Sequence, residues 1–253
     1  MSLPEAPLLR LDRVSKSFGG VRALAGVACA VGKHQIVGMI GPNGAGKTTL
    51  FNVITGAYHA DSGEIHFEER AITFWRPHRI ARAGVARTFQ NVRLFPSMTV
   101  WEHLLVAQPH RELWARRFLP PRWADPAAQA RAQDILVLLD LESARERPAR
   151  SLPFGVQRRV EMARALTAGP KLLLLDEPVA GMNAQEAEEL RALLLRLRER
   201  GLTILLIEHD MTFVMNLCDY LYVLDFGALI AQGTPNEIRI NSIVLDAYLG
   251  RED

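Results

Sequence analysis

The segment GPNGAGKT, from Gly41 to Thr48, carries the most specific chemical pattern of the sequence, because it matches G-x-x-x-x-G-K-[ST]. Glycines let the backbone wrap closely around phosphates, so that its N–H groups can point at their oxygens, and a helix that follows adds its positive end. Lys47 would contact the β- and γ-phosphates, and Thr48 would offer its hydroxyl to Mg²⁺. The pattern predicts a nucleotide site that contains Gly41, Asn43, Gly44, Ala45, Gly46, Lys47, Thr48 and Thr49.

Two adjacent acidic residues, Asp176 and Glu177, follow the apolar run Leu172–Leu175. An acidic side chain at the carboxyl end of a buried strand is well placed to hold Mg²⁺. The next residue, Glu177, could orient or deprotonate an attacking water. His209 follows the next apolar run, which makes it a candidate for contact with a γ-phosphate. These residues extend the prediction from nucleotide binding to nucleotide hydrolysis.

The elements that must position these residues alternate between strands and helices. Leu9, Leu11 and Val14 recur with a spacing typical of a half-exposed strand. The strand expected at 36–40 runs directly into the glycine-rich segment, and the helix after it is closed by Gly56. Further strands are expected at 27–31, at 64–67 after a turn at 61–63, and in the segments KLLLLDE, TILLIEH and YLYVLD. Because a helix capped by Asn183 and ending at Gly201 separates two of these strands, the pattern predicts an α/β fold with a parallel central sheet.

The block 95–165 differs from the rest, since it contains no convincing strand pattern. Thr99 and Glu102 have the spacing of a capping box, in which the hydroxyl and the carboxylate bond to each other's backbone N–H groups. A helical pattern returns at 127–141, and the proline- and arginine-rich stretch 109–126 is expected to be a solvated loop in preference to a membrane-surface segment. We therefore expect one domain of 1–253, with an α/β nucleotide-binding core of 1–94 and 166–253 and an α-helical lobe of 95–165.

Composition narrows the functional classes. The chain of 253 residues has a formal net charge of +2, which gives no argument for nucleic-acid binding. Cys29 and Cys218 lack the spacing of metal ligands and are expected to be buried thiols. The N-terminal sequence lacks the pattern of a secretory signal, and no window approaches the roughly twenty apolar residues that cross a bilayer. If the protein works at a membrane, another chain is expected to span it.

Several motifs, in this order, make the sequence resemble the ABC ATPase family along nearly the whole chain. They are the glycine-rich loop, RTFQNV, SLPFGVQRRVEMARAL, LLLLDEP, GMNA and EHD. The resemblance implies a P-loop NTPase core with a parallel central sheet, N-terminal antiparallel strands and an inserted α-helical lobe. It implies ATP and Mg²⁺ as cofactors, with Gln90, after a strand at 85–89, contacting Mg²⁺ and sensing the transport domain. It also implies that Phe18 stacks on adenine and that His209 contacts the γ-phosphate.

The family's signature loop, usually LSGGQ, is altered in this chain. It reads Leu152-Pro-Phe-Gly155-Val156 and is followed by Gln157. In the family this loop caps the γ-phosphate that is bound to the opposite subunit of a dimer, so Leu152, Gly155 and Gln157 are implied nucleotide contacts. Pro153 removes a hydroxyl and an amide, Val156 replaces the usual glutamine, and Asn183 replaces a common aspartate. We expect a sandwich that relies on backbone donors, and an ATPase that is weak or strongly dependent on its partners.

Longer stretches are similar to one subgroup, the ATP-binding subunits of high-affinity branched-chain amino-acid importers. These stretches are GVARTFQNVRLFPSMTVWEHLLVAQ, LPFGVQRRVEMARAL, EPVAGMN, LLIEHDM and VLDAYLG. The resemblance implies a second ATPase subunit in a homo- or heterodimer, two membrane permeases, and indirectly a periplasmic binding protein. It implies a peripheral location on the cytoplasmic face of the inner membrane. Arg93, Leu94 and Phe95 are candidates for contact with a permease.

Other functions fit the residues less well. ATPases of lipopolysaccharide export and of urea import look much like those of amino-acid import. In all of these systems the partner proteins choose the substrate. Soluble ABC proteins of translation usually join two ATPase domains, whereas this sequence has one. DNA-repair relatives insert long coiled coils between the P-loop and the signature, and no heptad run occurs here. A small-molecule kinase is opposed by the signature region and by Glu177.

Overall fold

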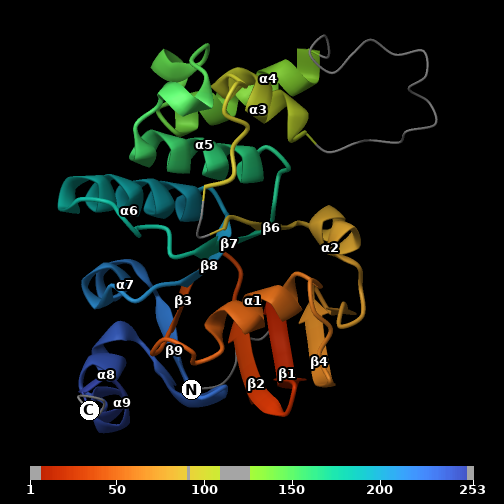
Figure 1. Ribbon diagram of the computed structural model, residues 1–253, viewed down its shortest axis with the longest axis vertical. Helices are drawn as coiled ribbons and strands as arrows, with labels where there is room; N and C mark the ends of the chain where they lie inside the picture. Colours follow the sequence, from red (N-terminus) through yellow and green to blue (C-terminus); the bar gives the residue numbers. More distant parts are fainter. Residues whose placement is uncertain (1–6, 90–91, 109–125, 250–253) are drawn as a thin grey trace. The chain divides into compact units, whose positions relative to one another are not determined.

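The computed structural model describes residues 7–89, 92–108 and 126–249 (Figure 1). The chain divides into two compact units, one made of Met1–Arg87 and Lys171–Asp253 and the other of Thr88–Pro170. The loop expected at 109–126 lies outside the described residues except for Pro126, and so does Gln90.

A six-stranded sheet forms the centre of the first unit, with the strand order β10-β9-β3-β8-β7-β6. Every neighbouring pair from β9 to β6 is parallel, and β10 runs antiparallel to β9. All residues of β3, β7 and β8 are buried, which confirms the central parallel strands that the apolar runs predict. The strands are β3 (Ile36–Ile40), β6 (Val85–Arg87), β7 (Leu172–Asp176), β8 (Thr203–Ile207), β9 (Tyr220–Asp225) and β10 (Ala228–Gly233).

A second, antiparallel sheet has the order β2-β1-β4-β5. Its strands are β1 (Leu9–Phe18), β2 (Val21–Val31), β4 (Ser62–Phe67) and β5 (Arg70–Ala71), so β2 and β4 begin earlier than their patterns predict. Leu9, Leu11 and Val14 are all buried. Strict alternation would turn Val14 to the other face, but the register shifts between Leu11 and Val14, and Arg13 has a φ of 49°. This bulge restores the apolar face, because it inserts one extra residue into β1.

One hydrophobic core joins side chains of both sheets with those of α1 (Lys47–Ile54), as represented by Leu11, Phe51 and Ile207. This packing fixes the helix that follows the glycine-rich loop against the strand that precedes it. The other helices of this unit are α2 (Pro77–Ala83), α6 (Ala184–Glu199), α7 (Met211–Leu217), α8 (Pro235–Arg239) and α9 (Ser242–Leu249). Asn183 and Glu186 form a complete capping box at the start of α6, as the sequence predicts.

The second unit is helical in its described part, with α3 (Val100–Val106), α4 (Pro126–Leu138) and α5 (Phe154–Leu166). The capping box of α3 is confirmed, since Thr99 Oγ1 accepts from the Glu102 N–H at 3.2 Å and Glu102 Oε2 accepts from the Thr99 N–H at 2.7 Å. Helix α3 packs against α4 and α5. Helix α4 ends three residues before the expected position, and Asp140 then adopts a φ of 54°, which a continuing helix does not allow.

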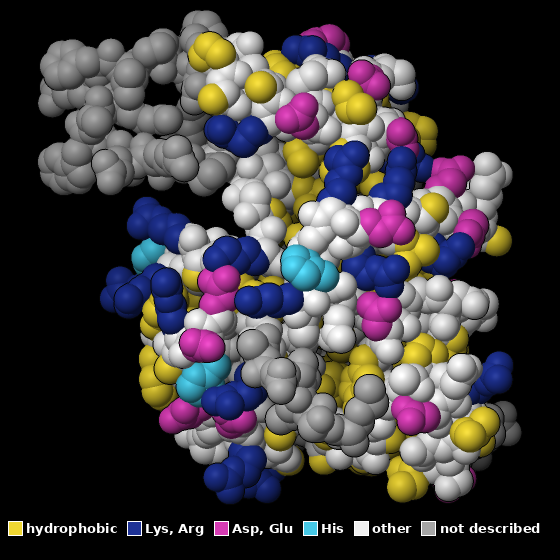
Figure 2. All heavy atoms as spheres, turned by 180° about the vertical axis from the view of Figure 1, so that it is seen from behind, with side chains coloured by type: hydrophobic (Ala, Val, Ile, Leu, Met, Phe, Trp, Pro, Cys, Tyr) yellow, Lys and Arg dark blue, Asp and Glu magenta, His cyan; other side chains and the backbone are white. Residues whose placement is uncertain are grey.

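The surface is mixed in charge. On the face drawn in Figure 2, Lys and Arg side chains lie interspersed with Asp and Glu side chains, as the net charge of +2 suggests. In the described part of the chain, none of the helices combines the length and the apolar character that a bilayer crossing requires.

Candidate functional site

The glycine-rich segment links the end of β3, at Ile40, to the start of α1, at Lys47. Gly41 has a φ of 148° and Gly46 a φ of 102°. A Cβ on Gly41 would overlap the carbonyl oxygen of Leu224, and one on Gly46 would overlap that of Ala23. Both positions therefore require glycine for conformation and for space, and the loop is packed closely against the neighbouring backbone.

The first backbone N–H groups of helix α1 have no carbonyl acceptor within the helix. The first intrahelical bond runs from the Leu50 N–H to the Gly46 carbonyl at 2.9 Å, and no side chain caps the helix. The N–H groups of Lys47, Thr48 and Thr49 precede that bond and have no earlier turn to bind. Together with the helix dipole they form a site suited to an anion such as a phosphate.

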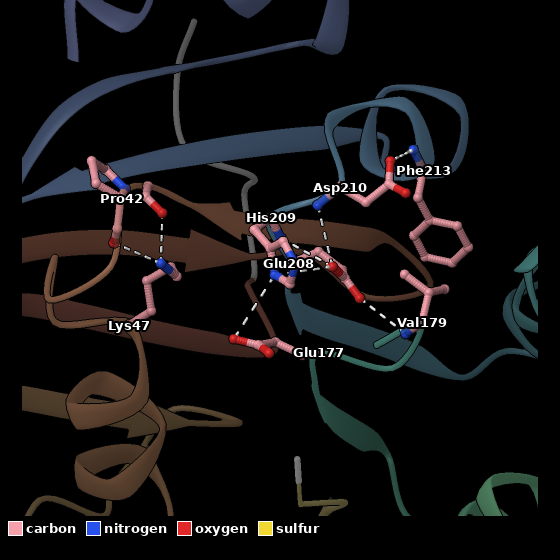
Figure 3. Close-up of polar contacts among 9 residues, drawn as sticks. Pro42, Lys47, Glu177, Val179, Glu208, His209, Asp210 and Phe213 are labelled. Carbon is pink, nitrogen blue, oxygen red and sulfur yellow. Dashed lines mark hydrogen bonds and ion pairs between the residues drawn. The ribbon is translucent and has the colours of Figure 1, made fainter. Parts of the chain in front are cut away.

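Lys47 lies folded over the loop. Its Nζ donates to the carbonyl oxygens of Gly41, at 2.6 Å, and of Pro42, at 2.9 Å (Figure 3). Burial lowers the pKa of this ammonium group, and the negative charges of Glu177 and Asp176 act in the opposite direction. Lys47 is therefore near enough to Asp176 and Glu177 for their charges to affect its pKa. The glycine-rich loop and the acidic pair, which the sequence predicts separately, thus belong to one site.

The acidic pair stands where β7 ends beside β8. Asp176 is in register with Ile207 of β8, and the Glu177 N–H continues the pairing by donating to the Ile207 carbonyl at 2.9 Å. His209 follows two residues later, and its Nδ1 lies 4.0 Å from Glu177 Oε1 (Figure 3). The parallel pairing brings Asp176, Glu177 and His209 to one edge of the sheet, although they are far apart along the chain.

The donor set suits a magnesium ion that is shared with phosphates. In the described residues, no group of three or more His, Cys, Asp or Glu side chains could hold a metal by itself. Mg²⁺ needs no such cage, since it usually keeps several waters and binds one or two protein groups together with substrate phosphates. The exposed Thr48 hydroxyl and the Asp176 carboxylate at the strand end could provide oxygen atoms of this kind.

Glu208 is a buried carboxylate that the sequence analysis misses. It is 0% exposed and accepts three backbone N–H groups, from Val179 at 3.0 Å, His209 at 2.9 Å and Asp210 at 3.3 Å (Figure 3). Burial raises its pKa, and the three N–H groups counteract that rise. Glu208 thus ties the segment after Glu177 to the segment that carries His209. The signal in the sequence is a charged residue directly after the apolar run TILLI.

Arg87 is a second residue that the sequence analysis misses. It ends β6, and its Nη2 lies 2.8 Å from Asp176 Oδ2, with both side chains almost fully buried. The segment RTFQNV draws attention to Gln90, and nothing in its pattern marks Arg87 as a partner of the acidic pair. Only the pairing of β6 with β7, which places Arg87 opposite Leu174, brings the two charges together.

Phe18 lies at the end of β1 and is 41% exposed. Its ring packs edge-on against Tyr58, with the centroids 5.1 Å apart, and the Lys16 ammonium lies 5.3 Å from its centroid. An exposed ring of this kind has a face that a base could stack on. Its contact with adenine stays a prediction.

In the helical unit, α5 begins within the altered signature loop. Pro153 occupies the N-cap position, with φ −56° and ψ 153°, and provides no side-chain cap. The Gln157 N–H donates to the Pro153 carbonyl at 3.0 Å, and Gln157 Nε2 donates to the Leu152 carbonyl at 2.9 Å. Gly155 lies in the first turn of α5. Because the Leu152 side chain is buried, only the backbone of Leu152 can face a ligand.

Known ABC transporter proteins match this chain over most of its length. The family model described as ABC transporter matches residues 24–180. High-affinity branched-chain amino acid transport ATP-binding protein BraF of Pseudomonas aeruginosa is 46% identical over 252 residues, which cover 96% of this chain and 98% of BraF. The corresponding protein LivG of Escherichia coli (strain K12) is 45% identical over 251 residues, with 96% and 98% coverage.

Solved structures of ATP-binding cassettes resemble this chain over nearly its whole length. The ADP conformation of MJ1267, an ATP-binding cassette of an ABC transporter, superposes with a TM-score of 0.87 at 35% identity and covers 97% of this chain and 99% of its own. A nucleotide-free ATP-binding cassette from an ABC transporter gives a TM-score of 0.85 at 35% identity, with 96% and 98% coverage. The fold is therefore that of these cassettes.

Proposed function

Because this chain belongs to the ABC transporter family, we propose that it is the ATP-hydrolysing subunit of an importer for branched-chain amino acids. The observation that carries the proposal is the single sheet edge at which Lys47, the Asp176–Glu177 pair and His209 come together. Branched-chain amino acids are proposed as the substrate because relatives that match almost the full chain are named for their transport.

The proposed reaction follows from the residues in place. The loop N–H groups and Lys47 bind the β- and γ-phosphates of ATP, and Phe18 supports the base. Thr48, Asp176 and Gln90 would hold Mg²⁺, which would supply positive charge to the phosphates. Glu177 accepts a proton from the attacking water as the new P–O bond forms and the bond to the ADP oxygen breaks. His209 donates a hydrogen bond to the γ-phosphate.

We propose that 1–94 and 166–253 act as the nucleotide-binding core and that 95–165 acts as the lobe that presents the signature loop. The α5 N-terminus, with Leu152, Gly155 and Gln157 beside it, caps a nucleotide held by a second ATPase subunit in a homo- or heterodimer. ATP binding closes this dimer and hydrolysis reopens it. Two permeases couple these steps to uptake from a periplasmic binding protein, at the cytoplasmic face of the membrane.

Replacing Pro153 with serine is expected to raise the ATPase rate of the isolated protein. A serine N-cap adds about 1 kcal/mol of helix stability, and losing the proline costs roughly 0.4–1 kcal/mol, so the folding free energy should barely change. The new hydroxyl can reach a γ-phosphate in trans, where a hydrogen bond to a charged group contributes about 1.5–3 kcal/mol. We therefore expect roughly tenfold more hydrolysis in a phosphate-release assay, with little change in melting temperature.

Pro148→Ser is the matched control. Pro148 is also an N-cap proline of the helical unit, with φ −68° and ψ 143°, but it precedes a different turn, Ala149–Ser151. The control should hydrolyse ATP at the wild-type rate. Brisk hydrolysis by the wild-type protein, with no gain from Pro153→Ser, would show that the altered loop does not limit the reaction.

Phe95 is the proposed anchor for a permease. Its side chain is 58% exposed, while its N–H donates to His103 Nε2 at 2.9 Å, and Arg164 Nη1 donates to the Arg93 carbonyl at 2.7 Å. These bonds fix the backbone and leave the aromatic ring at the surface, as a hot-spot anchor requires. Together with Arg93 and Leu94 it offers an apolar and cationic edge to a helix of the permease.

Phe95→Asp is expected to reduce co-purification with the permeases about 30-fold, because a central aromatic anchor contributes about 2 kcal/mol or more. ATP binding by the isolated chain should stay unchanged. Val137→Asp serves as the control, since Val137 is 50% exposed in the same unit. Equal recovery of permease with Phe95→Asp and with the wild type would place the docking surface elsewhere.

Reconstituted uptake tests the proposal as a whole. Vesicles that contain the permeases, both ATPase subunits and the binding protein should accumulate radiolabelled leucine only when ATP is supplied on the ATPase side. The same vesicles with Glu177→Gln should not accumulate leucine. ATP-driven uptake of urea, without uptake of leucine, would assign the chain to a different importer.

A further inference from the structure

Arg87 connects the helix after the P-loop to the strand that carries the acidic pair. Its Nη1 donates to Asn52 Oδ1 at 2.7 Å, and its Nη2 donates to Asp176 Oδ2 at 2.8 Å. The guanidinium carbon lies 5.4 Å from the centroid of the Phe51 ring. The Arg87 and Asp176 side chains are 8% and 6% exposed, so water screens this ion pair little.

The helix end of this bridge shares a face with a proposed magnesium ligand. Asn52 lies four residues after Thr48 on α1, and residues at this spacing lie above one another on the same side of a helix. The strand end of the bridge is Asp176 itself. The hydrogen bonds from Arg87 to Asn52 and to Asp176 therefore connect two parts of the site. One is the face of α1 that carries Thr48, and the other is the Asp176 carboxylate on β7.

We propose that Arg87 is a positioning residue that sets the separation of Thr48 and Asp176, and thereby the Mg²⁺ affinity of the nucleotide site. This inference rests on the proposed function, because it takes Thr48 and Asp176 to be the metal ligands. Arg87 holds one carboxylate oxygen and so fixes the orientation of the whole carboxylate. Its planar fork spans two acceptors at once, which the single ammonium group of a lysine at this position cannot reproduce.

Two variants separate position from charge. Arg87→Lys keeps the positive charge and loses the fork. Asn52→Leu removes the helix end of the bridge while Arg87 and Asp176 keep their pairing.

The measurement is binding of a fluorescent ATP analogue to the purified chain, titrated with MgCl₂ and repeated in EDTA. We expect both variants to need roughly 10-fold more Mg²⁺ for half-maximal binding, in line with the 10–100-fold losses seen for residues that support metal ligands. Analogue affinity in EDTA should stay within about twofold of the wild type, because the phosphate loop is intact.

Arg198→Lys is the matched control. Arg198 pairs with Asp219 at 2.7 Å in the same unit of the chain, and Asp219 accepts the N–H of Ile36 at the start of β3, whereas Asp176 lies at the end of β7. This variant should show the wild-type Mg²⁺ curve. An unchanged curve in both Arg87→Lys and Asn52→Leu would overturn the inference, and so would an equal loss of binding with and without Mg²⁺, which indicates general damage to the loop. Failure of the wild type to bind the analogue would instead contradict the proposed function.

Discussion

Replacing Glu177 with glutamine is expected to lower ATP hydrolysis by about 10²- to 10⁴-fold while ATP binding is kept, because glutamine has the same shape but cannot accept a proton from water. The backbone should not change, since Glu177 is held at a φ of 47° and its N–H donates to the Ile207 carbonyl at 2.9 Å. Lys47 keeps its bonds to the loop carbonyls, so the phosphate-binding half of the site stays intact. Phosphate release and analogue binding, measured on the same preparation, check both parts of this result.

Glu188→Gln is the control for this experiment. Glu188 is an exposed residue of α6 that pairs with Arg191 at 2.6 Å, outside the sheet edge that carries the site. Its removal should leave hydrolysis unchanged. Hydrolysis by Glu177→Gln within threefold of the wild type would mean that another group accepts the proton.

Replacing Lys47 with methionine is expected to weaken ATP binding by about 100-fold or more. Methionine keeps an unbranched stem in the buried position, so the change removes the ammonium group with little change in volume. Each hydrogen bond to a charged group contributes about 1.5–3 kcal/mol, and each 1.4 kcal/mol corresponds to a factor of ten in affinity. The dissociation constant of a fluorescent ATP analogue, titrated at fixed Mg²⁺, measures the loss.

Lys171→Met provides the comparison, because Lys171 forms an exposed ion pair with Glu68 at 2.6 Å and is not part of the loop. Its analogue affinity should equal that of the wild type. Binding by Lys47→Met within threefold of the wild type would exclude Lys47 as the main phosphate contact. Together with Glu177→Gln, this variant separates the two halves of the site, since one loses binding and the other loses chemistry.

The features that the sequence predicted correctly depend on residues that are neighbours along the chain. The glycine-rich segment is one continuous stretch, so its turn, its lysine and its helix start can be recognised from spacing alone. The same holds for the capping boxes of Thr99 and Asn183 and for the apolar strands β3, β7 and β8. In each case the physical cause is local: a conformation that only glycine adopts, a side chain that reaches its own helix, or a run of side chains that avoids water.

The features that the sequence did not reveal depend on contacts between distant segments. Val14 faces the core only because β1 bulges against β2, and a bulge is visible only in the pairing of two strands. Glu208 becomes a three-fold acceptor only when β7 and β8 end side by side. Arg87 becomes the partner of Asp176 and Asn52 only when β6 pairs with β7 and α1 packs nearby. The chain alone thus marks the groups that we propose to bind and hydrolyse ATP, whereas the buried charges that contact those groups are decided by tertiary packing, since a charged side chain stays buried only where the fold supplies its partners.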